Sequence, residues 1–189
     1  MPIHWRPGSS LAGRLLVASR NLIDPNFFRT VVLMLEHGEG ALGVVLNRPT
    51  TLAIAEVVPD WLPLAGRPAV VFTGGPVERT AAIGLARSQA DDHDGRFTPV
   101  SREVGIVDLG AGPDSLTHLV SDVRIYSGYA GWSAGQLEAE IETGGWLVLD
   151  ADPFDPLVSD PAALWNRAAL RAASGQGVQI RTDPRAEYN

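Results

Sequence analysis

Residues 30–47 read TVVLMLEHGEGALGVVLN, and this stretch decides the fold. Two runs rich in aliphatic residues, 30–36 and 41–47, flank the short polar segment 37–40, whose glycines suit a tight turn. The pattern therefore predicts a β-hairpin. The first run is apolar at consecutive rather than alternating positions, which indicates a strand that is covered on both faces.

Strand-like runs continue along the chain and outnumber the helical ones. Each is a short apolar segment bounded by glycine, proline or polar residues, which is the usual pattern of a strand. They lie at residues 15–18, 69–73, 81–86, 103–109, 123–127 and 146–150. Strands that follow one another with few helices between them predict an α+β domain with a mixed or antiparallel sheet.

Three segments have helical patterns. Residues 51–58 form a short one. Residues 133–143 form the clearest one, because Ser133 is a good N-cap and Gln136, three residues later, completes a capping box. The third spans residues 160–175 and opens with an Asp-Pro pair, which places a capping side chain before a proline in the first turn.

The composition is that of one globular domain. The chain has 189 residues, of which 45% are hydrophobic and 20% charged. Cysteine is absent, which excludes a disulfide framework, a thiolate metal site and a cysteine nucleophile. No apolar run approaches the roughly 18 residues of a membrane helix, and the first residues have no signal-peptide pattern. We therefore expect a soluble, cytoplasmic protein that does not enter a membrane.

The net charge of −7 argues against nucleic acid as a partner. Non-specific affinity for DNA or RNA comes from basic side chains that release counterions, and this chain is acidic overall. All 15 basic residues are arginine. The absence of lysine also excludes a P-loop lysine and a Schiff-base lysine.

Three stretches contain the residues of a nucleotide-binding, catalytic or metal-binding motif but lack other features that the motif requires. Residues 38–43, GEGALG, match a dinucleotide fingerprint but lead into a strand instead of the helix that would hold the pyrophosphate. Residues 131–135, GWSAG, match a nucleophile elbow, yet all four histidines precede Ser133. A triad in another chain order stays geometrically possible. The acidic loop 91–95, DDHDG, lacks the terminal carboxylates of a calcium loop. We predict no catalytic residue, no metal site and no cofactor.

Three blocks of sequence together resemble a known family. They read NLIDPNF at 21–27, GVVLNRP at 43–49 followed by GGPV at 74–77, and GYAGWSAGQLE at 128–138. In these blocks, and in their order from Leu11 to the last helix, the chain is similar to the YqgE/AlgH family of bacterial proteins.

The resemblance implies a fold and little biochemistry. It implies a single α+β domain with a mixed, barrel-like β-sheet and a few flanking helices. It places this domain at residues 11–175, with an N-terminal extension at 1–10 and a C-terminal tail at 176–189. The AlgH name implies transcriptional regulation, although the fold has no familiar DNA-binding element.

The matching blocks contain the candidate residues for binding a ligand or a partner. These are Asn47, Arg48, Gly74, Gly75, Tyr129, Trp132 and Gln136. Arg48 can form a forked pair with a carboxylate or phosphate, and the aromatic residues offer apolar area with polar tips. The two adjacent glycines let a ligand or another backbone come close. Our hypothesis is that these residues converge on one cleft at the edge of the sheet.

A structural role for the same residues is an equally concrete alternative. Arg48 would then pair with Asp24 or Glu138, and Trp132 would fill the core beneath the last helix. Gln136 would only complete the helix cap. Segment 59–64, PDWLPL, is either an exposed patch for self-association or packed under a helix.

The sequence favours a non-enzymatic binding or regulatory module that acts through a small molecule or a protein partner. This interpretation rests on the lack of a coherent catalytic set of residues. One alternative is a hydrolase-type enzyme that uses Ser133 or an anion held by Arg48. The other is a DNA-binding transcriptional regulator, as the AlgH name suggests.

Overall fold

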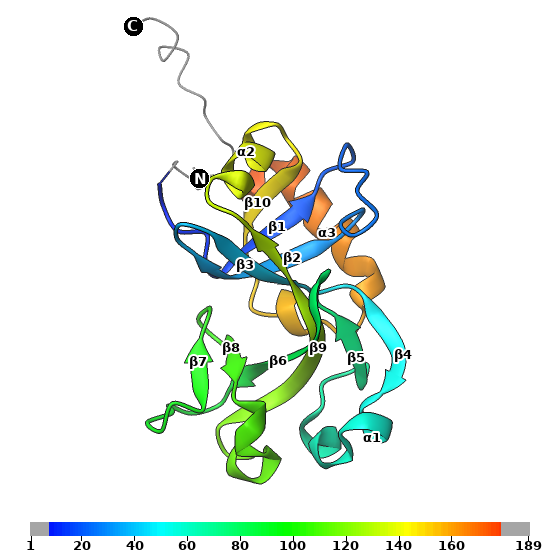
Figure 1. The fold of residues 1–189 in the computed structure, drawn as a ribbon, viewed down its shortest axis with the longest axis vertical. Helices are drawn as coiled ribbons and strands as arrows, with labels where there is room; N and C mark the ends of the chain where they lie inside the picture. The colour runs from blue at the N-terminus through cyan, green and yellow to red at the C-terminus, as the bar shows by residue number, and fades with distance from the viewer. Residues whose placement is uncertain (1–7, 179–189) are drawn as a thin grey trace, which may run out of the picture.

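One mixed sheet of eleven strands forms the frame of the described part of the chain (Figure 1). The computed structural model describes residues 8–178. The strand order is β11-β10-β1-β2-β3-β9-β6-β8-β7, with β4 paired to β5 and β5 paired to β9. The strands are β1 (Arg14–Ala18), β2 (Val31–His37), β3 (Ala41–Val45), β4 (Pro49–Ala53), β5 (Val70–Thr73), β6 (Val77–Ser88), β7 (Phe97–Pro99), β8 (Val104–Val107), β9 (Val120–Trp132), β10 (Trp146–Asp150) and β11 (Gly177–Val178).

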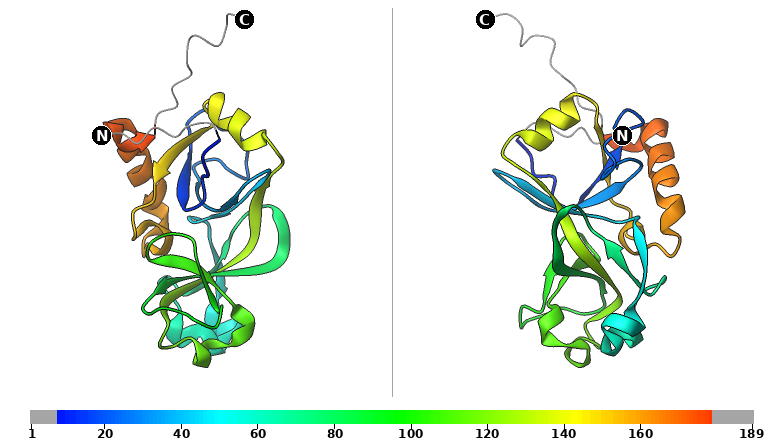
Figure 2. Two further views of the ribbon diagram at one scale, coloured as in Figure 1. Left: turned by 90° about the vertical axis from the view of Figure 1, so that its left-hand side faces the viewer. Right: turned by 45° about the vertical axis from the view of Figure 1, so that its right-hand side comes forward.

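The helices are short and lie on the outside of this sheet. Three are α-helices, α1 (Ile54–Val57), α2 (Gln136–Glu142) and α3 (Leu164–Arg171). The others are single turns or distorted segments, η1 (Pro59–Leu64), η2 (Leu109–Ala111), η3 (Pro113–Ser115), η4 (Asp155–Leu157), η5 (Pro161–Ala163) and η6 (Ala172–Gln176). The prediction of an α+β domain with a mixed, barrel-like sheet is confirmed, since the sheet curls and β5 runs parallel to β9 (Figure 2). Parts of the expected extension and tail, residues 1–7 and 179–189, lie outside the described residues.

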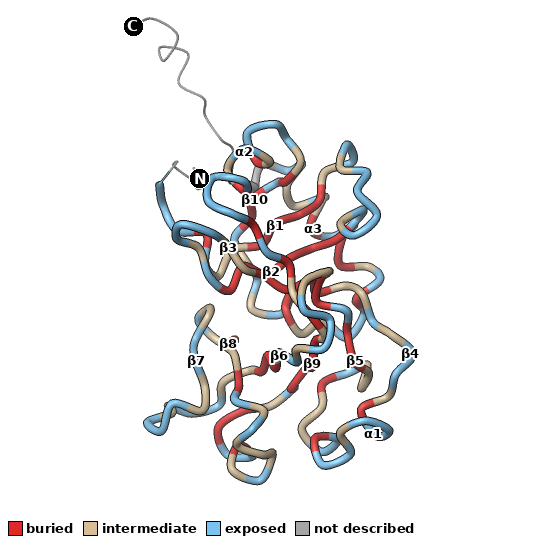
Figure 3. Tube along the Cα trace, viewed as in Figure 1, coloured by how far each residue is buried: buried red, intermediate tan, exposed pale blue. Residues whose placement is uncertain are grey.

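The predicted hairpin is formed by β2 and β3, which pair antiparallel. Helices α2 and α3 lie on opposite sides of β1 and β2 (Figure 2). Leu33 packs in the cluster that includes α3, whereas its neighbour Val32 packs in the cluster that includes α2. This double cover explains why β2 is apolar at consecutive positions, and it appears as a continuous buried stretch in Figure 3.

Strand β9 is longer than the sequence predicts. We expected a strand at 123–127 only, but the strand extends from Val120 to Trp132 and includes Tyr129. That expectation was wrong because glycine weakens a strand locally, while the ladders to β3, β5 and β6 supply hydrogen bonds from distant parts of the chain.

The helix predictions have mixed outcomes. Residues 49–53 form edge strand β4 and only 54–57 are helical, because pairing with β5 overrides the weak helical pattern. Helix α2 begins at Gln136 rather than near Ser133, although the Gln136 side chain still accepts the Ser133 N–H at 3.1 Å. At the third helix, Asp160 caps the 3-10 turn η5, where its side chain accepts the Ala163 N–H, and α3 follows from Leu164 without a side-chain cap of its own. In η1, Trp61 is buried and Leu62 is exposed.

Three glycines, Gly74, Gly75 and Gly128, allow the turn between β5 and β6 to cross β9 at backbone contact. A Cβ atom on Gly74 or Gly75 would collide with the backbone of Gly128 or Tyr129. On the other side, a Cβ atom on Gly128 would lie 2.7 Å from the Gly75 carbonyl oxygen, and Gly128 has a φ of +72°. The crossing therefore excludes side chains at these positions.

Arg124, in the middle of β9, is a buried cation that has no carboxylate partner among the described residues. Its guanidinium donates to the carbonyl oxygens of Arg67 at 2.7 Å and Val158 at 2.8 Å, and it lies 4.3 Å from the centre of the Phe72 ring. Burial raises the pKa of nearby Tyr126 to about 12, and the positive charge of Arg124 opposes this shift only in part.

We expect Gly128→Ala to destabilise the domain by roughly 3 kcal/mol. The new Cβ atom would collide with two carbonyl oxygens, and an alanine would also be strained at the positive φ of this position. Gly131→Ala is the matched control in the same strand, since its Cβ atom would have no neighbour closer than 3.6 Å. It should change the free energy of unfolding by less than about 1 kcal/mol. Urea unfolding curves measure both, and equal effects would contradict the crossing.

Tyr126 should make the domain less stable at alkaline pH. Below about pH 10 the phenol is neutral in both states, but between pH 10 and about 12 it ionises only in the unfolded chain. The free energy of unfolding then falls by about 2–3 kcal/mol as the pH rises through this window. Unfolding curves of wild type and Tyr126→Phe between pH 9 and pH 12 test this, and an unchanged alkaline slope in the variant would refute it.

Candidate anion-binding site

A cavity of about 270 Å³ opens where three connections of the sheet meet. The β1–β2 loop, the β3–β4 connection and the β5–β6 turn each contribute to its wall. The lining residues are Pro25, Asn26, Val45, Arg48, Pro49, Thr73, Gly75, Pro76 and Arg79. Among the described residues, the wall thus contains two arginines and no acidic residue.

Asn47 and Arg48 hold the loop that forms one side of this cavity. The Asn47 side chain accepts the Val31 N–H at 3.0 Å and donates to the Arg29 carbonyl oxygen at 2.9 Å. Arg48 Nη2 donates to the Phe28 carbonyl oxygen at 2.6 Å. These three bonds fix the end of the β1–β2 loop before β2 begins, so the cavity wall is organised without a ligand.

Neither cavity arginine forms an ion pair with a carboxylate in residues 8–178. The expected structural pairing of Arg48 with Asp24 or Glu138 is therefore not found in this part of the chain. The Asp24 carboxylate instead accepts the Asn26 N–H at 2.7 Å. Arg79 is exposed, and its carbonyl oxygen accepts the Ser127 hydroxyl, which ties its backbone to β9. Two uncompensated positive charges at one cavity attract an anion.

The two candidate glycines have different positions at this site. Gly74 donates to the Ser127 carbonyl oxygen and accepts from the Val45 N–H, both at 2.8 Å, so it joins β3 to β9. Gly75 lines the cavity, and its missing side chain admits the backbone of Tyr129. The close approach expected at this turn is thus made by another part of the chain.

Trp132 and Gln136 lie apart from the cavity. The indole N–H groups of Trp132 and Trp146 donate to one oxygen of Glu140, at 3.0 and 2.8 Å, and the Gln136 amide donates to the other at 2.9 Å. Trp132 packs with α2 rather than beneath the last helix, and it lines a different cavity at the β2–β3 turn. Tyr129 is half-buried against the central core. Of the candidate residues, only Arg48 and Gly75 line the same cavity.

Sequence reasoning missed several residues of the cavity wall. Asn26 lies within the NLIDPNF block that carries the family resemblance, so a signal for it existed. Thr73 and Arg79 had no such signal. They flank the Gly74–Gly75 turn, and they reach the cavity only because that turn crosses β9.

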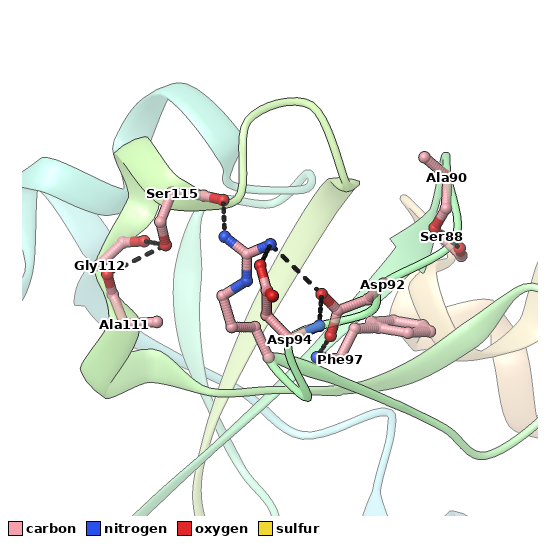
Figure 4. A network of polar contacts seen from close by, with 9 residues as sticks. Ser88, Ala90, Asp92, Asp94, Phe97, Ala111, Gly112 and Ser115 are labelled. Atoms are coloured by element: carbon pink, nitrogen blue, oxygen red, sulfur yellow. Dashed lines mark hydrogen bonds and ion pairs between the residues drawn. The ribbon is translucent and has the colours of Figure 1, made fainter.

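The other motif matches have local structural roles. The Ser133 hydroxyl lies 3.2 Å from Gln136 Oε1, and no histidine among the described residues forms a hydrogen bond with it. In the acidic loop, Asp92 accepts the Phe97 N–H at 2.9 Å, which lowers the pKa of Asp92, and it also pairs with Arg96 (Figure 4). Arg96 pairs with Asp94 as well. Two of the three loop carboxylates, those of Asp92 and Asp94, thus have partners within residues 92–97.

Comparison with known proteins places the chain in a family. The family model described as AlgH-like matches residues 15–176. The chain belongs to the AlgH-like family. A UPF0301 protein of Streptomyces coelicolor is 46% identical over 181 residues, with 93% of each chain covered. A UPF0301 protein of Mycobacterium ulcerans is 46% identical, with 85% of this chain and 82% of the relative covered.

Two solved structures have the same AlgH-like architecture. The crystal structure of protein DIP2367 from Corynebacterium diphtheriae superposes with a TM-score of 0.83 at 30% identity, over 91% of this chain and 94% of the other. The solution structure of the AlgH protein from Pseudomonas aeruginosa gives 0.65 at 31% identity, over 92% and 93%. Within residues 8–178, no helix is long and apolar enough to cross a membrane.

We expect Asn47→Ala to loosen the β1–β2 loop, because the variant loses both side-chain bonds to the chain at Arg29 and Val31. Trypsin cuts this lysine-free chain only after arginine, so cleavage between the exposed Arg29 and the buried Thr30 reports on opening of the loop. A loss of about 1–2 kcal/mol in local stability predicts roughly tenfold faster cleavage there. Asn166→Ala removes an exposed amide of α3 and is the control. If Asn47→Ala and the wild type are cleaved after Arg29 at equal rates, the Asn47 side chain does not hold the β1–β2 loop in place.

Proposed function

We propose that this AlgH-like protein is a non-enzymatic binding module that takes a small organic anion in the cavity beside Arg48 and Arg79. One observation carries the proposal: in the described part of the chain, two arginines and no acidic residue line one cavity, and neither arginine has a carboxylate partner. Guanidinium groups in such a position favour carboxylate or phosphate.

The size and rigidity of the cavity suit a small molecule. A volume of about 270 Å³ lies just below the range of small-ligand pockets, which is about 300–1,000 Å³. The hydrogen bonds of Asn47 and Arg48 already order the loop that carries Asn26, so a ligand loses less free energy to ordering the protein. The local positive charge also contrasts with the net charge of −7, so an anion is attracted to this position rather than to the whole surface.

A regulatory role, which the AlgH name implies, would be exerted through the bound ligand and a protein partner. Direct binding to DNA is disfavoured, because an acidic chain gains little from counterion release. The hydrolase alternative gains no support from Ser133, whose hydroxyl contacts Gln136 and no basic side chain in the described part.

A thermal-shift screen with small phosphates and carboxylates tests the proposal. A ligand at 100 times its Kd adds about 2.7 kcal/mol, which raises the Tm of a domain of this size by roughly 5–11 °C. Arg48→Gln should abolish the shift because it removes the group that binds the anion. Arg167→Gln, which removes one exposed positive charge on α3, should keep the shift and thereby controls for net charge.

The screen can also fail in two informative ways. If no anion raises the Tm of the wild type, the cavity is not an anion site and the proposal is wrong. If Arg48→Gln and Arg167→Gln lower the shift equally, the anion responds to net charge rather than to the cavity. Circular dichroism spectra of both variants show whether the fold is kept.

A further inference from the structure

We infer that the ligand of this cavity is a phosphate monoester with a small apolar body, an inference that rests on the proposed anion-binding function. The cavity brings together two positive charges, a polar rim and apolar walls. The two positive charges and the polar rim favour a doubly charged phosphoryl group over a single carboxylate, and the apolar walls favour an attached carbon body.

The charge of the cavity wall favours a dianionic ligand. Arg48 and Arg79 together contribute two positive charges, and the cavity wall contains no negative one. A phosphate monoester carries a charge of about −1.5 to −2 at pH 7. A monocarboxylate neutralises only one guanidinium and leaves the second uncompensated, whereas a dianion matches both.

The number of hydrogen-bond donors in the cavity wall also favours a phosphoryl group. A phosphoryl group presents three strong acceptor oxygens. Besides the two guanidinium groups, the wall contains the amide of Asn26 and the hydroxyl of Thr73, and neither side chain has a hydrogen-bond partner within residues 8–178. A carboxylate has two oxygens and uses fewer of these donors than a phosphoryl group does.

The apolar part of the cavity wall favours a ligand with a carbon body attached to the phosphate. Pro25, Val45, Pro49 and Pro76 form apolar parts of its wall. Inorganic phosphate makes no use of these surfaces, and the cavity has space for several further atoms beyond a phosphoryl group. A phosphate attached to a compact carbon body satisfies both the charged and the apolar parts.

Calorimetric titration with matched probes tests this inference. Phenyl phosphate is the dianionic probe, methyl phenyl phosphate has the same body with one charge, and benzoate replaces the phosphoryl group by a carboxylate. We expect phenyl phosphate to bind at least tenfold more tightly than either monoanion at pH 7.5. Its affinity should fall as the pH drops through about 6, where the second phosphate proton returns. Inorganic phosphate should bind more weakly because it lacks the apolar body.

Variants of the two arginines show which of them produces the preference for the dianionic probe. Arg79→Gln should reduce the preference for phenyl phosphate over its monoanionic methyl ester to less than threefold, because only one guanidinium then remains. Arg48→Gln should abolish binding of every probe. Arg167→Gln should leave the preference unchanged. If Arg79→Gln keeps the full preference, Arg79 does not recognise the second charge and the inference is overturned.

The probes separate failure of this inference from failure of the proposed function. If benzoate or the methyl ester binds as tightly as phenyl phosphate, and Arg48→Gln abolishes that binding, the cavity is an anion site of a different class. Tighter binding of phthalate, a dicarboxylate, likewise overturns the phosphate assignment and keeps the site. If no probe binds the wild type, both the inference and the proposed function are wrong.

Discussion

The rest of the structure depends on the backbone crossing at which Gly74 and Gly75 pass Gly128 and Tyr129. Because no side chain separates the two segments there, Gly74 bonds to β3 on one side and to β9 on the other. Strand β9 can then pair with β3, β5 and β6 along its length and belong to both ends of the sheet. The same crossing brings the β5–β6 turn beside the β3–β4 connection, which creates the cavity.

The parts of the fold that depend on local pattern could be predicted from the sequence. Residues 30–47 contain both the hairpin runs and the turn glycines, so β2 and β3 followed from neighbouring residues alone. The length of β9 could not be predicted in this way. Gly128 and Gly131 indicate a loop when taken locally, and they lie in a strand only because partners more than 40 positions away complete the ladder.

In the candidate site, too, some residues could be predicted from local sequence and others depend on tertiary contacts. Arg48 was identifiable because it lies in a block that resembles the family, but Arg79 becomes its neighbour in the cavity only after the crossing forms. Trp132 and Gln136 also lie in a block that resembles the family. In the structure, however, the Trp132 indole N–H and the Gln136 amide both donate to the Glu140 carboxylate. Whether a polar side chain has an internal partner is decided by tertiary contacts, and a linear pattern does not contain this information.

An arginine without a carboxylate partner does not by itself indicate a binding site, and Arg124 demonstrates the distinction. Arg124 also lacks an ion pair in residues 8–178, but it is 2% exposed, its guanidinium donates to carbonyl oxygens, and the Phe72 ring covers its charge. Its charge is thus stabilised within the core. Arg48 contacts one carbonyl oxygen and otherwise borders empty volume, together with a second cation. The combination of uncompensated charge and accessible volume separates a candidate ligand site from a structural arginine.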